Sequence, residues 1–278
     1  SIATLLKTIL DGAASRGMIA LLDMHRLVPC CAEGQSWFGY SNWLPEDVWM
    51  ASWMALLKRF GTHPSVFAVD LFNEPRDTSN WGQGGATDWH AAASRLITAI
   101  MSEQPQFKGL FFVQGTSGNG GPSPFANAFP VFWGEYLQGV YEKPIVSGGN
   151  RVVYSPHVFG PSVYMQSYFQ DSSFPLNMEN IWDLHFGWVA QRTGRAVVVG
   201  EWGGTDAGMD AQWQTAFAEY LNAHGISSFY WTLNPGSSNT GGWMLPDGAM
   251  NHDKLAHIKA AQPNPTAYTG SLFNGYCI

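Results

Sequence analysis

Apolar runs of strand length alternate along this chain with segments of helical periodicity. The strand-like runs lie at residues 18–23, 66–72, 109–114, 151–155, 196–200 and 226–231. The helical segments lie at residues 2–15, 45–60, 87–101, 179–192, 209–224 and 253–261. This alternation predicts an α/β fold in which helices wrap a parallel sheet. Six strands, five of them followed by a helix, come after one extra helix and predict a (β/α)8 TIM barrel whose first two β/α units are absent from this chain.

A single catalytic domain accounts for most of the chain. The 278 residues, 45% of them hydrophobic, match the length of one barrel domain. We assign residues 1–262 to the barrel, which is incomplete at its N-terminus, and residues 263–278, which begin Pro263-Asn264-Pro265, to a tail or linker. Residues 115–150 are rich in Gly, Pro, Ser and Asn, and a loop of this length is usually functional.

The amino-acid composition narrows the classes of molecule that this protein is expected to bind. A net charge of −7 with only 14 Lys and Arg excludes a basic surface for nucleic acid or anionic membranes, and no apolar run reaches the roughly 20 residues of a membrane span. No nucleotide or metal motif is present, so no cofactor is expected. The 13 Trp residues and the low content of charged residues are common in secreted polysaccharide-degrading enzymes. More than half of the aromatic rings are expected in the core, and the rest as stacking platforms for sugars.

The three cysteines leave several pairings open. A disulfide can join Cys277 to Cys30 or Cys31, a partner can lie outside this chain, or the thiols can stay unpaired and buried. Their spacing does not suggest a zinc site.

Polar residues follow the predicted strands, where the reactive groups of barrel enzymes lie. These residues are His25, Asn73-Glu74, Gln114, His157, Glu201 and Trp231. Glu74 in Asn-Glu-Pro and Glu201 in Gly-Glu-Trp-Gly-Gly are both carboxylic acids, and two such acids about 5–5.5 Å apart catalyse double displacement at an anomeric carbon. The acid must stay protonated in apolar or negatively charged surroundings, and the nucleophile must stay ionised among hydrogen-bond donors.

Supporting roles follow for the other strand-end residues. Asn73 is a candidate donor to the substrate 2-hydroxyl, and Trp231 a candidate floor beneath the sugar. Simpler roles compete with these: His25 and His157 as structural hydrogen-bonding groups, and Trp231 as core packing.

The motifs around these residues resemble the cellulases of glycoside hydrolase family 5, and the resemblance spans nearly the whole chain. It rests on Leu22-Asp23-Met24-His25, Leu71-Phe72-Asn73-Glu74-Pro75, His157-Val158-Phe159-Gly160-Pro161, Gly200-Glu201-Trp202-Gly203-Gly204 and Phe229-Tyr230-Trp231-Thr232-Leu233-Asn234-Pro235. Residues 166–169 and Phe174-Pro175 look like the bacterial endoglucanase branch.

The resemblance implies an eight-stranded barrel with Glu74 as acid/base and Glu201 as nucleophile. It also implies that His25, Asn73, His157 and Trp231 support the active site. Trp37, in Ser36-Trp37-Phe38-Gly39, aligns with an aromatic residue that stacks on a glucose ring, and packing within its loop is the alternative.

Two departures from the family pattern stand out. Where family members carry a Tyr that donates to the nucleophile, this chain has Phe159, which cannot donate; we expect slower attack unless Tyr164 or a water substitutes. The first two strands, which carry an Arg in the family, are not in this sequence. We expect them either in an N-terminal part missing from this chain or in another polypeptide.

The predicted function is that of a retaining endo-β-1,4-glucanase acting through a covalent glycosyl-enzyme on a β-glucan. The same chemistry on mannan, xylan or mixed-linkage glucan is one alternative, because pocket loops set specificity. A catalytically impaired glucan-binding or assembly protein that retains the barrel is the other.

Overall fold

The computed structural model describes residues 1–27, 37, 46–76, 78–118 and 130–264. Its strands form one curled parallel sheet in the order β1-β2-β3-β4-β6-β5, with β7 paired to β6. They are β1 (Ala20–Asp23), β2 (Val66–Asp70), β3 (Leu110–Val113), β4 (Val152–Tyr154), β5 (His157–Phe159), β6 (Ala196–Gly203) and β7 (Ser227–Tyr230). This is the architecture of a (β/α)8 barrel, and the predicted fold class is confirmed.

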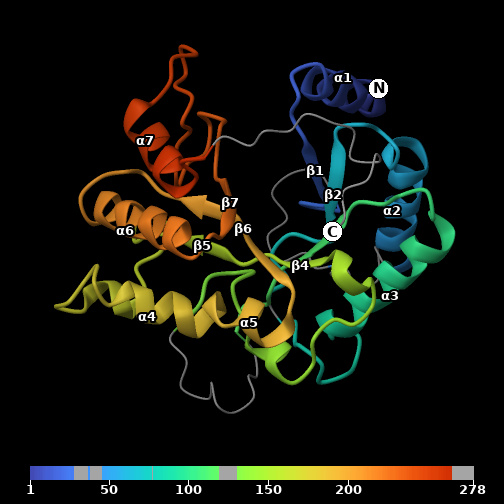
Figure 1. The fold of residues 1–278 in the computed structure, drawn as a ribbon, viewed down its shortest axis with the longest axis horizontal. Coiled ribbons are helices and arrows are strands. Elements are labelled where there is room, and N and C mark those ends of the chain that lie inside the picture. Colours follow the sequence, from blue (N-terminus) through green and yellow to red (C-terminus); the bar gives the residue numbers. More distant parts are fainter. Residues whose placement is uncertain (28–36, 38–45, 77, 119–129, 265–278) are drawn as a thin grey trace.

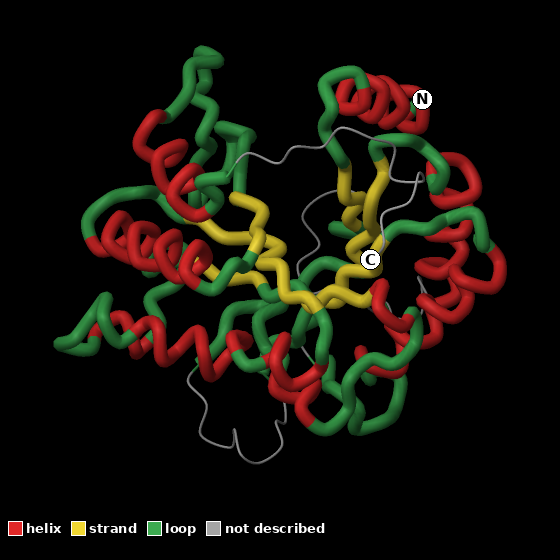
Figure 2. Tube along the Cα trace, viewed as in Figure 1, coloured by secondary structure: helices red, strands yellow, loops and turns green. Residues whose placement is uncertain are grey.

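Helices cover the outer face of this sheet (Figures 1 and 2). Helices α2 and α3 lie against the β1–β3 side, and α4, α5 and α6 against the β5–β7 side. The α-helices are α1 (Ile2–Ala14), α2 (Glu46–Phe60), α3 (Trp89–Glu103), α4 (Met178–Trp182), α5 (Val189–Thr193), α6 (Met209–Ala223) and α7 (His252–Ala261). Short 3-10 turns occupy Gln138–Tyr141, Gly149–Arg151 and Ser167–Gln170.

The strands alternate between two environments because successive side chains point to opposite faces. The outer face packs against the helices in the main core. On the other face, Ala68, Phe112 and Val153 form a separate buried cluster with Leu21 and Val198 packed against it. Two residues further along their strands, the same face carries the polar residues Asp23, Asp70, Gln114 and Ser155.

Two elements differ from the sequence-based expectation. The strand predicted at residues 151–155 continues as β5, and both parts pair with β6; Ser155 and Pro156 interrupt them, and the Pro156 carbonyl accepts from Gly200 N–H at 2.9 Å. The helix predicted at 179–192 is broken by a π-helical turn at Asp183–Gly187. That turn accommodates His185, which is fully buried against the Glu135 carboxylate at 2.7 Å.

Helix α3 begins at Trp89, two residues after the start of the predicted segment, and the Asp88 side chain accepts from Ala91 N–H at its N-terminus. The expected irregular loop at 115–150 contains only 3-10 turns in its described part. Helix α7 ends at Ala261. Cys30, Cys31 and Cys277 lie outside the described residues. Within those residues, none of the helices has the length and apolar character needed to span a membrane.

Candidate active site

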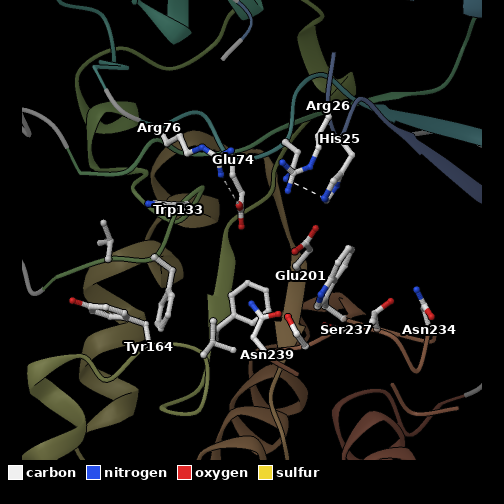
Figure 3. A pocket seen from close by; sticks show the side chains of 18 of the residues that line it. His25, Arg26, Glu74, Arg76, Trp133, Tyr164, Glu201, Asn234, Ser237 and Asn239 are labelled. Atoms are coloured by element: carbon white, nitrogen blue, oxygen red, sulfur yellow. Dashed lines mark hydrogen bonds and ion pairs between the residues drawn. The ribbon is translucent and has the colours of Figure 1, made fainter. Parts of the chain in front are cut away.

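The carboxyl ends of the strands surround a cavity of about 820 Å³. Five predicted site residues line it, namely His25, Asn73, Glu74, Glu201 and Trp231. Figure 3 shows Glu74 and Glu201 extending from opposite walls with their carboxyl groups directed toward each other. The chain thus brings together two glutamates that are far apart in sequence.

Glu74 is held in an unusual backbone conformation just beyond the end of β2. Its φ is 49°, in the left-handed region that non-glycine residues seldom adopt. Its N–H donates to the Gln114 side-chain oxygen at 2.7 Å. The carboxylate lies 3.8 Å from Arg76 and is 15% exposed.

His157 lies between the two carboxyl groups. In the register of β5 and β6 it pairs with Glu201, which places both side chains at the same level of the barrel. Its Nδ1 is 3.3 Å from Glu74 Oε1 and 3.5 Å from Glu201 Oε2. One ligand atom from each of the three residues lies within 4.8 Å of the others. This spacing is far below the ~6.5–9.5 Å of inverting glycosidases and fits the retaining arrangement.

The electrostatics of Glu201 run against the sequence-based expectation. Burial raises the pKa of its carboxyl well above the usual range, and the nearby charges of Glu74, Asp23 and Asp70 raise it further. A nucleophile should instead be kept ionised. Among the described residues, His157 is the polar neighbour of the Glu201 carboxylate, and no hydroxyl donates to it.

Phe159 accounts for part of this lack of hydrogen-bond donors to Glu201. It lines the same cavity with a buried ring, in the position where the family resemblance implies a phenol. Tyr164 also lines the cavity, but its exposed side chain makes no hydrogen bond to Glu201 in the described structure.

His25 and Trp231 form one wall of the cavity. Their rings are stacked with centroids 5.4 Å apart, and His25 Nδ1 is hydrogen-bonded to Asp23 at 2.7 Å. Asn73 Nδ2 lies 3.5 Å from the other ring nitrogen of His25. This arrangement leaves part of Trp231 facing the cavity, where a sugar ring can pack.

Trp37 lies elsewhere. Its side chain is fully buried, with its ring 4.9 Å from Trp89 and 6.4 Å from Phe72, so the structure places it in the core and not among the lining residues. The expectation that it stacks on a glucose ring is not supported by this position, and the alternative of packing fits it.

Several lining residues were not singled out from the sequence. Trp133 is 52% exposed in the cavity wall, and the Arg76 guanidinium lies 4.4 Å from its ring centroid. Arg26 and the segment 234–239 also contribute. Trp133 belongs to the long loop expected to be functional, which was the one signal for it; nothing in the pattern distinguished Arg26.

The trio of Glu74, His157 and Glu201 has a spacing that could also ligate a metal ion. The acid pair of a glycosidase requires the same proximity, so the trio does not indicate a separate metal centre.

Comparison with known proteins gives one consistent family. The family model for cellulase, glycosyl hydrolase family 5, matches residues 1–237. An endoglucanase from Paenibacillus polymyxa is 38% identical over 244 residues, which cover 86% of this chain and 59% of that protein. The major extracellular endoglucanase of Xanthomonas campestris pv. campestris is 39% identical over 251 residues, covering 88% of this chain and 50% of that protein. This chain thus spans between half and three fifths of these curated relatives.

Solved structures agree. The catalytic domain of the major endoglucanase from Xanthomonas campestris pv. campestris has a TM-score of 0.85 at 35% identity, covering 94% of this chain and 74% of that one. An endocellulase from Pyrococcus horikoshii in complex with cellotetraose has a TM-score of 0.86 at 32% identity, covering 93% of this chain and 73% of that one.

Proposed function

This chain belongs to the cellulase family, glycosyl hydrolase family 5, and on that premise we propose that it is a retaining endo-β-1,4-glucanase. The observation that carries the proposal is the approach of the Glu74 and Glu201 carboxyl groups, with His157, to within 4.8 Å in a cavity that an oligosaccharide can enter. Retaining double displacement requires carboxyl groups this close.

In the proposed reaction Glu201 attacks the anomeric carbon while Glu74 protonates the departing glycosidic oxygen. The glycosidic bond breaks and a glycosyl ester forms on Glu201. Glu74, now ionised, takes a proton from water, which displaces Glu201 and releases the sugar with its original configuration. The reactive state of the pair therefore has its proton on Glu74.

Glucan is the proposed substrate class because both curated relatives are endoglucanases and one solved neighbour holds cellotetraose. Trp231 and Trp133 offer aromatic surfaces in the cavity to the apolar faces of sugar rings. Mannan, xylan and mixed-linkage glucan are distinguished by assaying release of reducing ends from a panel of these polysaccharides.

The roles of the two glutamates are tested by substitution. Glu74→Ala and Glu201→Ala should each lower activity on carboxymethyl cellulose by roughly 10²–10⁴-fold. Azide should rescue them differently, giving the β-glycosyl azide from Glu74→Ala and the α-glycosyl azide from Glu201→Ala. Glu46→Gln, which removes a partly exposed carboxylate paired with Arg95 on the outer helices, is the control. Undiminished activity in either alanine variant would overturn the assignment.

One observation favours a second candidate function, that of a glucan-binding protein with impaired catalysis. Phe159 leaves Glu201 without a phenol donor, and burial raises the Glu201 pKa. Binding of cellotetraose in calorimetry without any hydrolysis over a long incubation would support this candidate against the hydrolase.

An extracellular location is also proposed, because one relative is a major extracellular endoglucanase. Immunoblots of culture medium and cell fractions from the native host test it.

A further inference from the structure

The backbone of Glu74 requires support that its own conformation does not provide. Among the described non-glycine residues, only Glu74 and Asp206 have a positive φ. Such a conformation persists where surrounding contacts hold it. For Glu74 the contact is the hydrogen bond from its N–H to Gln114 Oε1 at 2.7 Å.

Gln114 is in turn held at three points. Its side chain is buried at the end of β3, and its Nε2 donates to Asp70 Oδ2 at 2.9 Å. Its backbone carbonyl accepts from the Trp89 indole at 2.8 Å. A Cβ on Gly134, whose φ is 77°, would lie 2.9 Å from Gln114 Oε1, so the backbone there packs closely on the amide.

Asp70 decides which way the amide faces. A Gln side chain can present either its oxygen or its nitrogen to a neighbour, and its nitrogen would meet the Glu74 N–H as a second donor. The Asp70 carboxyl, buried on the neighbouring strand β2, accepts from the nitrogen and turns the oxygen toward Glu74. The three residues thus form a chain of donors and acceptors from the sheet to the acid/base.

We propose that Gln114 and Asp70 are positioning residues that hold the Glu74 carboxyl where it can protonate the leaving group. This inference rests on the proposed function, because it assumes that Glu74 is the acid/base. Neither residue lines the cavity; Gln114 contacts the Glu74 backbone directly, and Asp70 reaches Glu74 through Gln114. Without the Gln114 oxygen, the Glu74 N–H loses its acceptor and the backbone relaxes away from the left-handed conformation.

The chemistry of the leaving group separates this role from a merely structural one. A dinitrophenyl cellobioside has a good leaving group and needs little protonation, whereas a phenyl cellobioside has a poor one and depends on the acid. Displacement of the acid by about 1 Å is expected to lower kcat/KM on the phenyl substrate by about 10²-fold. On the dinitrophenyl substrate we expect a change of only about threefold, because the acid supplies little of that rate.

The experiment measures kcat/KM on both substrates for Gln114→Leu, Gln114→Glu and Asp70→Asn/Gln114→Glu. In Gln114→Glu a carboxylate faces Asp70 and repels it. The double variant exchanges the acid and the amide between positions 70 and 114 and restores the hydrogen-bond chain. The Asn at position 70 can donate to the Glu at position 114, which still accepts from the Glu74 N–H. It should recover most of the phenyl activity lost in Gln114→Glu, about tenfold or more.

Two further variants make the outcomes unambiguous. Gln214 is the matched control, because it is also buried, donates to Asp210 at 3.0 Å and accepts from the Tyr230 hydroxyl at 2.7 Å, but does not contact Glu74. Gln214→Leu should lower kcat/KM on the phenyl and dinitrophenyl substrates by similar factors. Glu74→Gln should show the selective loss on the phenyl substrate.

Equal losses on the two substrates in Gln114→Leu, or no recovery in the double variant, would overturn the inference while leaving the proposed function intact. Absence of a selective loss in Glu74→Gln itself would instead remove the acid/base role on which the inference depends.

Discussion

Phe159→Tyr should raise the activity of this protein. Phe159 lies two residues beyond His157 on β5, so both side chains point to the same face of the sheet. His157 Nδ1 is 3.5 Å from Glu201 Oε2 on that face, and Phe159 lines the same cavity as Glu201. A phenol at position 159 therefore brings a hydrogen-bond donor to a buried carboxyl group that has few.

The size of the effect depends on how far a new hydrogen bond stabilises the ionised form of Glu201. Burial and the charges of Glu74, Asp23 and Asp70 all raise the pKa of Glu201 and so disfavour that form. A hydrogen bond to a charged group contributes about 1.5–3 kcal/mol. If about half of that stabilises the ionised form of Glu201 after the hydroxyl is desolvated, this form becomes about three- to tenfold more populated.

The assay is the pH dependence of kcat/KM on a soluble cello-oligosaccharide. Phe159→Tyr should raise the maximum of kcat/KM about three- to tenfold and move the acid limb to lower pH, because the ionised form of Glu201 then persists in more acidic solution. Phe132→Tyr is the matched control: its ring lines the cavity, is 7% exposed like that of Phe159, and lies 6.0 Å from it. A rise without movement of the acid limb, or the same movement in the control, would refute the reasoning.

Three other substitutions test neighbouring features. Glu201→Gln should raise Tm at neutral pH but not in acid. A carboxyl group whose pKa is raised by folding contributes stability that is fully present below its unfolded pKa and is lost as pH rises through its folded pKa. Equal effects on Tm at all pH values would contradict this. Gly200→Ala places a Cβ 2.9 Å from His157 Nε2. This overlap should lower the free energy of unfolding by about 1–3 kcal/mol and kcat/KM by about tenfold. An unchanged urea midpoint together with an unchanged kcat/KM would contradict this prediction. Lys254→Met leaves the Thr240 carbonyl without its buried donor and should lower the free energy of unfolding by about 1–3 kcal/mol in denaturant titration. We also expect a raised KM, because the neighbouring residues 234–239 line the cavity. An unchanged KM would argue that Lys254 does not position this loop.

Local pattern was sufficient for most of the fold. Continuous apolar runs such as residues 66–69 are typical of strands that are covered on both faces, so their alternation with amphipathic segments indicated the parallel sheet. The pattern failed where long-range contacts decide local geometry. His185 in the broken helix is buried against Glu135, which lies far away in the sequence, and the extension into β5 depends on pairing with β6.

In the active site, too, some features were predictable from local sequence and others depended on long-range contacts. Glu74 and Glu201 were predictable because strand ends in a barrel converge and because their flanking motifs are specific; the family assignment agrees with those motifs. Trp133 and Arg76 were not, because a loop carries no periodicity that tells which side chains face the cavity. The burial of Trp37 was equally invisible, since an aromatic residue in a loop can pack inward or stack outward.

The sequence by itself indicated the family, the parallel α/β architecture and two strand-end glutamates as candidates for the acid pair, because these depend on residue type and on a repeated local pattern. Only the tertiary structure decided the protonation tendency of Glu201 and the orientation of Glu74 by Gln114 and Asp70. The reason is physical: desolvation and hydrogen-bond direction depend on neighbours from distant segments, and a linear pattern does not specify distances between them.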